Sequence, residues 1–440
     1  MLTPPNPESF QERALPRPSF AEAFRFWLKL GFISFGGPSG QIAIMHAELV
    51  ERKRWIDEAR FLHALNFCML LPGPEAQQLA IYIGWLLHRI RGGIVAGALF
   101  VIPSTLLLWA LSYVYVAFGH VPSVAAIFYG LKPAVVAIVA AAVIRIGQRA
   151  LRRPILWFVA AAAFLALYFG HAPFPLVIVG AGLLGLASDR LGFTGKIDGA
   201  QGAAVRAEAA RRSESSPAVG RVARTCAIGL LVWGLPILLA GIVFGREHTI
   251  FREGIFFSKA ALVTFGGAYA VLPYVSQQAV EHYHWLSAPQ MLDGLGLAET
   301  TPGPLIMVLQ FVGFIGAWNH PGQLPPLFAA TLGALITTWV TFTPCFLWIF
   351  LGAPYIEKLR GNKALNSALS TVTAAVVGVI LNLAVWFGLH ALFPLGRIDW
   401  FAAGVSALAF VGILKWKWNV IPVVIGSGMA GLLCKLAFSR

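Results

Sequence analysis

The sequence predicts an all-α, polytopic membrane protein built from two inverted-topology repeats with broken helices. Three observations lead to this fold class: composition, a series of long apolar segments, and an internal repeat. Of the 440 residues, 58% are hydrophobic and only 12% are charged, whereas an ordinary soluble domain has roughly 25% charged residues. This composition excludes a large soluble enzyme and suits many membrane spans of about 20 residues each.

About 13 apolar segments are candidate transmembrane helices. The first unit, residues 1–190, contains the segments 20–48, 59–87, 93–118, 123–148, 154–170 and 173–189. A polar stretch at 191–224 is predicted to be a cytoplasmic linker. The last unit, residues 225–440, contains the segments 225–244, 254–280, 289–318, 325–352, 366–392, 398–414 and 418–438. The first, second, eighth and ninth segments hold glycine and proline breaks, so they either span fully or are re-entrant.

The second half of the chain repeats the first. A shift of 230 residues gives 14 identities in the 60 ungapped positions from 26 to 85, and it places Trp55 on Trp285. After an 11-residue insertion the offset becomes 241 and matches Pro103 with Pro344. This agreement exceeds what biased apolar sequence would produce, so the chain is a tandem duplication.

The segment 225–244 has no counterpart and makes the second copy start on the opposite side of the membrane. With a cytoplasmic N-terminus, roughly twice as many lysines and arginines lie inside as outside, as the positive-inside rule expects. The basic run at 52–54 is an exception, because this topology places it outside; a re-entrant first pair of segments is the alternative. Inverted repeats are typical of secondary transporters, whose substrate sites lie at broken helices near the midplane.

Two proline–glycine motifs at equivalent positions are the strongest candidates for such breaks. Pro72-Gly73-Pro74 and Pro302-Gly303-Pro304 cannot continue an α-helix. The second proline suits the start of a new helix, whose free N–H groups and positive dipole end attract anions. Because the motif occurs in both copies, a binding site is favoured over a simple kink.

Gly36-Gly37 and Gly266-Gly267 form a second pair of candidate breaks. Glycine pairs let the backbone bend or approach a ligand closely. They also permit tight helix packing in membranes, and the sequence leaves these two roles open.

Charged residues inside the apolar segments are candidate site residues. Lys29 and Lys259 are equivalent and are predicted to balance substrate charge, with snorkelling to the interface as the alternative. Lys132 lies near the centre of a span without a charged counterpart. Glu75 and Glu299 are predicted to carry a proton or to pair with a lysine, and a purely structural ion pair is the alternative.

Polar side chains beside the breaks are candidate hydrogen-bond partners of an oxyanion, although each alone is more often a helix-to-helix hydrogen bond. They are Ser39, Gln41, Asn66, Gln77, Gln78, Thr300 and Thr301. The four cysteines are dispersed, so neither a disulfide framework nor a metal site is indicated, and no cofactor or nucleic-acid partner is expected. The chain lacks the nucleotide-binding and common hydrolase motifs, which disfavours an enzyme.

These residues give the chain a close resemblance to the chromate transporter family in its long, two-domain form. The similarity covers nearly the whole chain and is carried by FGGP at 35–38, LPGPEAQQLA at 71–80, TFGGAY at 264–269 and ETTPGP at 299–304. The resemblance implies a carrier in the bacterial inner membrane that exports chromate and gives chromate resistance.

The sequence also allows other functions. Sulfate has the shape and charge of chromate, so cation-coupled uptake of sulfate or another oxyanion is the main rival. An intramembrane enzyme that uses Glu75 and His63 would stay active in detergent, without a membrane gradient. A non-transporting sensor or assembly factor would retain its function when both lysines are replaced by alanine. A homodimer is left open.

Overall fold

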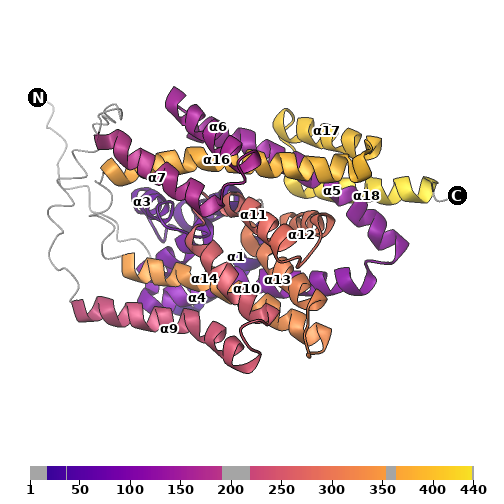
Figure 1. The fold of residues 1–440 in the computed structure, drawn as a ribbon. Helices are drawn as coiled ribbons and strands as arrows, with labels where there is room; N and C mark the ends of the chain where they lie inside the picture. The colour runs from indigo at the N-terminus through magenta and orange to yellow at the C-terminus, as the bar shows by residue number, and fades with distance from the viewer. Residues whose placement is uncertain (1–16, 36, 191–218, 353–362, 439–440) are drawn as a thin grey trace, which may run out of the picture.

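The computed structural model describes residues 17–35, 37–190, 219–352 and 363–438, and every regular element in these ranges is a helix (Figure 1). The first half contains α1 (Phe20–Ile33), α2 (Gly37–His46), η2 (Ala47–Arg52), α3 (Glu58–Cys68), α4 (Glu75–Phe118), α5 (Pro122–Ala150), α6 (Pro154–Tyr168) and α7 (Phe174–Arg190). The second half contains α9 (Val219–Val243), α10 (Thr249–Leu262), α11 (Ala268–Gln277), η3 (Gln278–His282), α12 (Ala288–Thr300), η4 (Leu305–Met307), α13 (Val308–Asn319), α14 (Pro326–Gly352), α16 (Lys363–Leu392), η6 (Pro394–Gly396), α17 (Trp400–Leu414) and α18 (Val420–Phe438).

Many of these helices are suited to a bilayer. Six of them, α4, α5, α9, α14, α16 and α18, are long and apolar enough to cross a membrane, and shorter apolar helices accompany them. The extra span α9 buries only 6% of its most apolar window against the protein, which leaves the rest of that surface for lipid. The predicted all-α, polytopic membrane fold is confirmed, while the number of about 13 spans stays a prediction.

The four segments predicted to be broken are all interrupted. In the first copy, α1 ends at Ile33 and α2 begins at Gly37, while α3 and α4 are separated by residues 69–74. In the second copy, α10 and α11 are separated by residues 263–267, and α12 and η4 by residues 301–304. A further non-helical point at His88 and Arg89 divides α4, in agreement with the predicted boundary after residue 87.

Helix packing follows the duplication. With the offset of 241, α5, α6 and α7 correspond to α16, α17 and α18. Helix α5 packs against α17 and α18, whereas α16 packs against α6 and α7. Each copy therefore uses the same contact surface toward the other, which is the relation that a two-fold axis generates.

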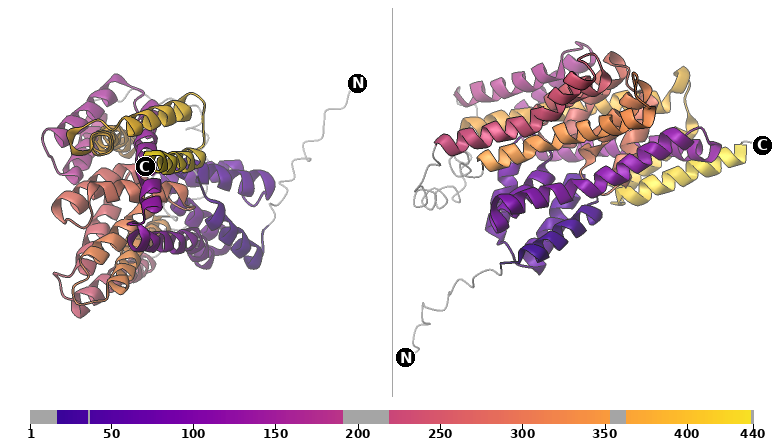
Figure 2. Two further views of the ribbon diagram at one scale, coloured as in Figure 1. Left: turned by 90° about the vertical axis from the view of Figure 1, so that its right-hand side faces the viewer. Right: turned by 90° about the horizontal axis from the view of Figure 1, so that it is seen from below.

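The helices fall into two groups (Figures 1 and 2). One group contains α5, α6, α7, α16, α17 and α18, and the other contains α1, α4, α9, α10, α13 and α14. The short helices α11 and α12 contact members of both groups, since α12 packs on α5 and α13, and α11 packs on α16 and α10. These two short helices, which belong to the broken segments of the second copy, thus lie between the two groups.

Local structure is also repeated. A π-helical turn, η2 or η3, follows the second helix of each copy. The ring of Trp55 packs edge-on to Phe26 at 5.4 Å, and the ring of Trp285 packs edge-on to Phe256 at 5.6 Å. These aromatic pairs lie at the positions that the 230-residue shift aligned, so equivalent sequence folds into equivalent structure.

Glycines bring helices together in both copies. A Cβ on Gly84 would lie 2.4 Å from the carbonyl oxygen of Gly92, and one on Gly313 would lie 2.8 Å from that of Gly333. In each case the two helical segments of a hairpin touch through their backbones. This is the close packing that small residues permit inside a membrane.

Candidate functional site

The broken helices of the two copies are hydrogen-bonded to each other. Gly73 N donates to Thr264 O at 2.7 Å, and Gly303 N donates to Ser34 O at 2.8 Å. The 230-residue shift aligns Gly73 with Gly303 and Ser34 with Thr264, so the two hydrogen bonds are equivalent. We call the Ser34–Gly303 contact crossing one and the Gly73–Thr264 contact crossing two. Both motif glycines thus use their N–H groups to join the copies.

The two hydroxyl residues at the crossings are equivalent. Ser34 Oγ donates to Leu30 O at 2.6 Å, and Thr264 Oγ1 donates to Ala260 O at 2.7 Å. Both side chains are fully buried. The bonds return each hydroxyl to the last turn of its helix, and the main-chain carbonyl of Ser34 or Thr264 is the group that accepts from the other copy. Sequence reasoning missed these residues, although both copies carry a hydroxyl at this position.

Both motif glycines need their lack of a side chain. Gly73 has a φ of 124° and Gly303 has a φ of 106°, in the region that favours glycine. A Cβ on Gly73 would lie 2.8 Å from Cys345 Sγ, and a Cβ on Gly303 would lie 2.5 Å from Ser104 Oγ. Ser104 lies on α4 and Cys345 lies on α14, and the offset of 241 aligns the two residues. Equivalent residues of the two copies therefore pack against the two motif glycines.

Glutamine side chains support the breaks. Gln41 Nε2 donates to Gly303 O at 2.5 Å and to Ser34 O at 3.3 Å, so it connects the two sides of crossing one. Gln78 Nε2 donates to Pro72 O at 2.8 Å. Gln77 is fully buried, and neither polar atom of its amide has a partner in the described chain. A buried amide without partners is costly, and the part of Gln77 in substrate binding stays a prediction.

Helix N-termini at the crossings lack side-chain caps. Helix α4 begins after Pro74, α11 after Gly267 and η4 after Pro304, and none of these three positions makes a side-chain cap bond. The first N–H groups of such a helix have no partner within it. Together with the dipole, they make each N-terminus attractive to an anion. Crossing two combines two of these N-termini with the unpartnered amide of Gln77.

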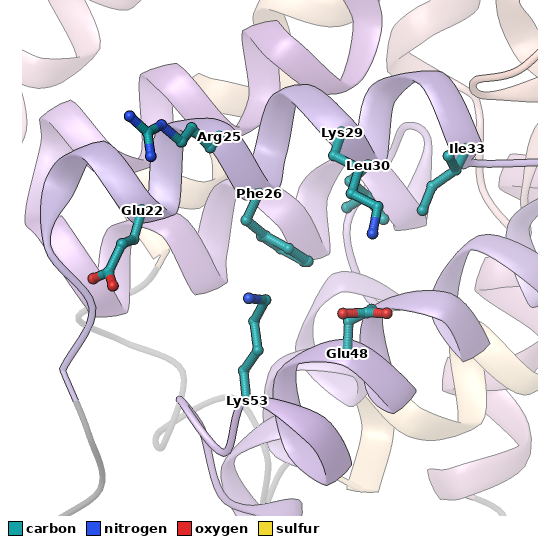
Figure 3. A pocket seen from close by; sticks show the side chains of 8 residues that line it. All are labelled: Glu22, Arg25, Phe26, Lys29, Leu30, Ile33, Glu48 and Lys53. Atoms are coloured by element: carbon teal, nitrogen blue, oxygen red, sulfur yellow. The ribbon is translucent and has the colours of Figure 1, made fainter.

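The two predicted lysines lie away from the crossings. Lys29 is exposed on α1 and lines a cavity of about 260 Å³ with Arg25, Glu48 and Lys53. Figure 3 shows this cavity between α1 and the turn at η2, with Lys29 and Glu48 directed toward each other. Lys259 is exposed in the last turn of α10, and no described residue forms an ion pair with it. Their role in charge balance therefore stays a prediction.

The predicted carboxylates have different surroundings. Glu299 is buried and accepts a hydrogen bond of 2.5 Å from Tyr269 Oη. Glu75 is half-buried as the first residue of α4. Within the described ranges neither forms an ion pair with Lys29 or Lys259, and their part in proton coupling stays a prediction.

A partly buried ion pair lies elsewhere, between the two copies. Lys132 Nζ on α5 is 3.8 Å from Asp293 Oδ1 on α12, and Tyr115 Oη donates to Asp293 Oδ2 at 3.0 Å. Sequence reasoning identified Lys132 but missed Asp293. The signal was present, because Asp293 is an acid inside the apolar segment 289–318.

The remaining candidate residues bond within their own helix, lie at a break or on the surface, or lie outside the described residues. The hydroxyl of Thr300 donates to Gly296 O and Leu297 O, and that of Thr301 donates to Ala298 O. Asn66 is exposed on α3. Gly37, Gly266 and Gly267 have φ values of 66°, 80° and 92°, as expected at breaks. Gly36 and the side chain of Ser39 lie outside the described residues.

The fold and the crossings define the class of protein: a polytopic membrane transporter of two repeats joined through broken helices. The sequence model of the chromate transporter family matches residues 21–186 and 252–432. The chain therefore belongs to the chromate transporter family, whose members are transporters and not enzymes.

Named relatives agree with this assignment. The chromate transport protein of Pseudomonas aeruginosa is 33% identical over 96% of this chain and 94% of its own length. That of Cupriavidus metallidurans is 29% identical over 95% of this chain and 94% of its own. A probable chromate transport protein of Synechococcus elongatus is 27% identical over 91% of each chain. No solved structure matches the chain.

Proposed function

We propose that this protein exports chromate across the bacterial inner membrane and thereby gives chromate resistance. The names of the relatives point to the substrate. The observation that carries the site is the reciprocal bonding of the two copies at their breaks, beside uncapped helix N-termini. The proposal includes a cytoplasmic N-terminus, a first repeat at 1–190, a cytoplasmic linker at 191–224, and an inverted second repeat within 225–440.

In the proposed mechanism, chromate binds at the crossings through main-chain N–H groups and amides. A tetrahedral oxyanion suits these donors, because it accepts hydrogen bonds from several directions. The glycines let the backbone approach the ion, the prolines hold the N-termini open, and Gln77 donates from its unpartnered amide. The exposed cations Lys29 and Lys259 act on the approach of the ion by raising its local concentration.

The membrane potential favours export of an anion. One charge is worth about 2.3 kcal/mol per 100 mV, so a dianion leaving a negative interior gains roughly twice that amount. Export therefore needs no ATP. Sulfate carries the same charge and shape, and we propose it as a competing ligand. We also propose a homodimer, which the mass of the purified protein in detergent tests.

Chromate uptake into everted vesicles with a positive interior tests the function. Vesicles containing the protein should accumulate chromate, and dissipating the potential should reduce the rate by tenfold or more, since about 100 mV on a dianion is worth over 4 kcal/mol. Vesicles without the protein are the control. Normal insertion with no protein-dependent uptake would refute chromate export.

Lys29→Ala should raise the chromate KM about three- to tenfold at low salt, because one cation is removed from the cavity wall. Lys29→Arg should retain the wild-type KM, and Lys415→Ala removes an exposed lysine after α17 as a matched control. The effect should shrink at high ionic strength. Equal KM values for Lys29→Ala and Lys415→Ala would show that Lys29 has no part in substrate approach.

A further inference from the structure

Glu253 on α10 is a buried carboxylate that the proposed transport mechanism does not use. Its side chain is fully buried, and neither Oε1 nor Oε2 has a hydrogen-bond partner in the described chain. Its counterpart in the first copy is Ala23. The group is therefore not part of the duplicated architecture, and it needs an explanation of its own.

Two glycines make the space that this carboxyl group occupies. Helix α10 packs against α13 and α14. A Cβ on Gly316 of α13 would lie 2.6 Å from Glu253 Oε1, and a Cβ on Gly333 of α14 would lie 2.7 Å from Oε2. The carboxyl group is thus enclosed by the backbones of a helical hairpin, in contact with both of its helices.

Among the described residues, no charged group forms an ion pair with this carboxyl group. On the same helix, Arg252 pairs with the exposed Glu247, and His248 caps the helix start. On the facing side, the ring of His320, which follows α13, bonds to the main chain of His284. None of these charged or titratable groups has an appreciable electrostatic interaction with Glu253.

An ionised carboxylate in such a place is strongly unfavourable. Burying an unpaired charge costs several kcal/mol even after relaxation, and acidic residues inside membrane proteins typically mark proton or ion pathways. A metal cation would need several oxygen ligands around it, whereas both carboxyl oxygens here contact glycine backbones. The ligand that fits is a single proton.

We propose that Glu253 is a proton-binding site that couples proton movement to oxyanion transport. The proton is held while α10 is docked on the α13–α14 hairpin, and it leaves when the start of α10 moves toward water. The same helix ends next to Thr264, which accepts the Gly73 hydrogen bond at crossing two. Helix α10 ends at Leu262, nine positions or about 14 Å along the helix from Glu253, and Thr264 follows two positions later.

This inference rests on the proposed function and adds the coupling ion to it. Helix α10 docks only when the proton is bound, and the same helix leads into crossing two. Proton binding and anion binding therefore affect each other, and this thermodynamic linkage is reciprocal. Because the first copy has alanine at this position, one proton site serves the two crossings.

A carbodiimide and a matched pair of variants test the proposal. Dicyclohexylcarbodiimide modifies protonated carboxyl groups in apolar surroundings, so mass spectrometry of the labelled full-length protein should find Glu253 modified and Glu247 unmodified.

In proteoliposomes, wild-type chromate flux should change about fivefold or more between about pH 6 and about pH 8, and Glu253→Gln should reduce this change to about twofold or less. Glu247→Gln should behave as wild type. Since each protein meets the same chromate species at each pH, the comparison isolates the carboxyl group.

The outcomes separate this proposal from the proposed function. Chromate flux in the wild type with an unchanged pH profile in Glu253→Gln would overturn the proton site and leave chromate transport standing. Absence of label on a detected Glu253 peptide would also overturn it, even if Glu253→Gln failed to fold. Absence of chromate flux in the folded wild type would instead refute the proposed function.

Discussion

Gly303→Ala should reduce chromate transport by at least about tenfold and destabilise the protein, with about 1–2 kcal/mol from backbone strain and about 1–3 kcal/mol from overpacking. Gly303 has a φ of 106°, and the added Cβ would lie 2.5 Å from Ser104 Oγ. Relief requires a shift of the backbone that donates to Ser34 O at crossing one. Transport rate and thermal unfolding of the purified variant measure the two effects.

Gly267→Ala is the matched control for this prediction. Gly267 also has a positive φ, of 92°, but apart from its chain neighbours no atom of the described residues lies within 4 Å of an added Cβ. The variant should therefore show only the strain of about 1–2 kcal/mol and a smaller loss of transport. Combining Gly303→Ala with Ser104→Gly should recover part of the loss. Equal losses in Gly303→Ala and Gly267→Ala would contradict the packing described for crossing one.

Lys132→Met should destabilise the protein by about 3 kcal/mol, because it leaves Asp293 buried without its cation. The pair is 3.8 Å apart and joins α5 of the first copy to α12 of the second. Adding Asp293→Asn should recover most of the stability, since the amide removes the uncompensated charge and still accepts a bond from Tyr115. Thermal unfolding of the two single variants and the double variant forms a cycle that isolates the pairwise interaction.

The outcome of the cycle bears directly on how the copies are joined. A coupling energy of about 1 kcal/mol or more would show that the pair stabilises the contact between the repeats. Strictly additive effects of the two substitutions would contradict that role. Lys435→Met, which removes an exposed lysine that lies over the Tyr129 ring, controls for loss of a basic residue outside the pair.

Sequence reasoning predicted the architecture well because its signals are local. Proline and glycine at 72–74 and 302–304 stop a helix through their own covalent geometry. The duplication was visible in aligned residues such as Trp55 and Trp285, and the structure repeats their ring contacts. The helices end where the breaks were predicted, without any tertiary information.

The crossings could not be predicted in the same way. Ser34 and Gly303 are far apart in the sequence, and a pairing of this kind depends on how whole helices pack. The partner of Lys132 is Asp293 and not one of the two acids beside the breaks, for the same reason. The segment boundaries placed Lys29 inside a span, but only the helix orientation shows that it faces a surface cavity.

The position of chromium in a chromate-bound structure is the measurement that tests the central claim most directly. Anomalous scattering from chromium would locate the ion without reference to any residue. We expect it at a crossing, about 4 Å from the first N–H groups of α4 or η4, as hydrogen bonds to chromate oxygens require. Chromium found only in the cavity lined by Lys29 and Lys53, with both crossings empty, would contradict the account.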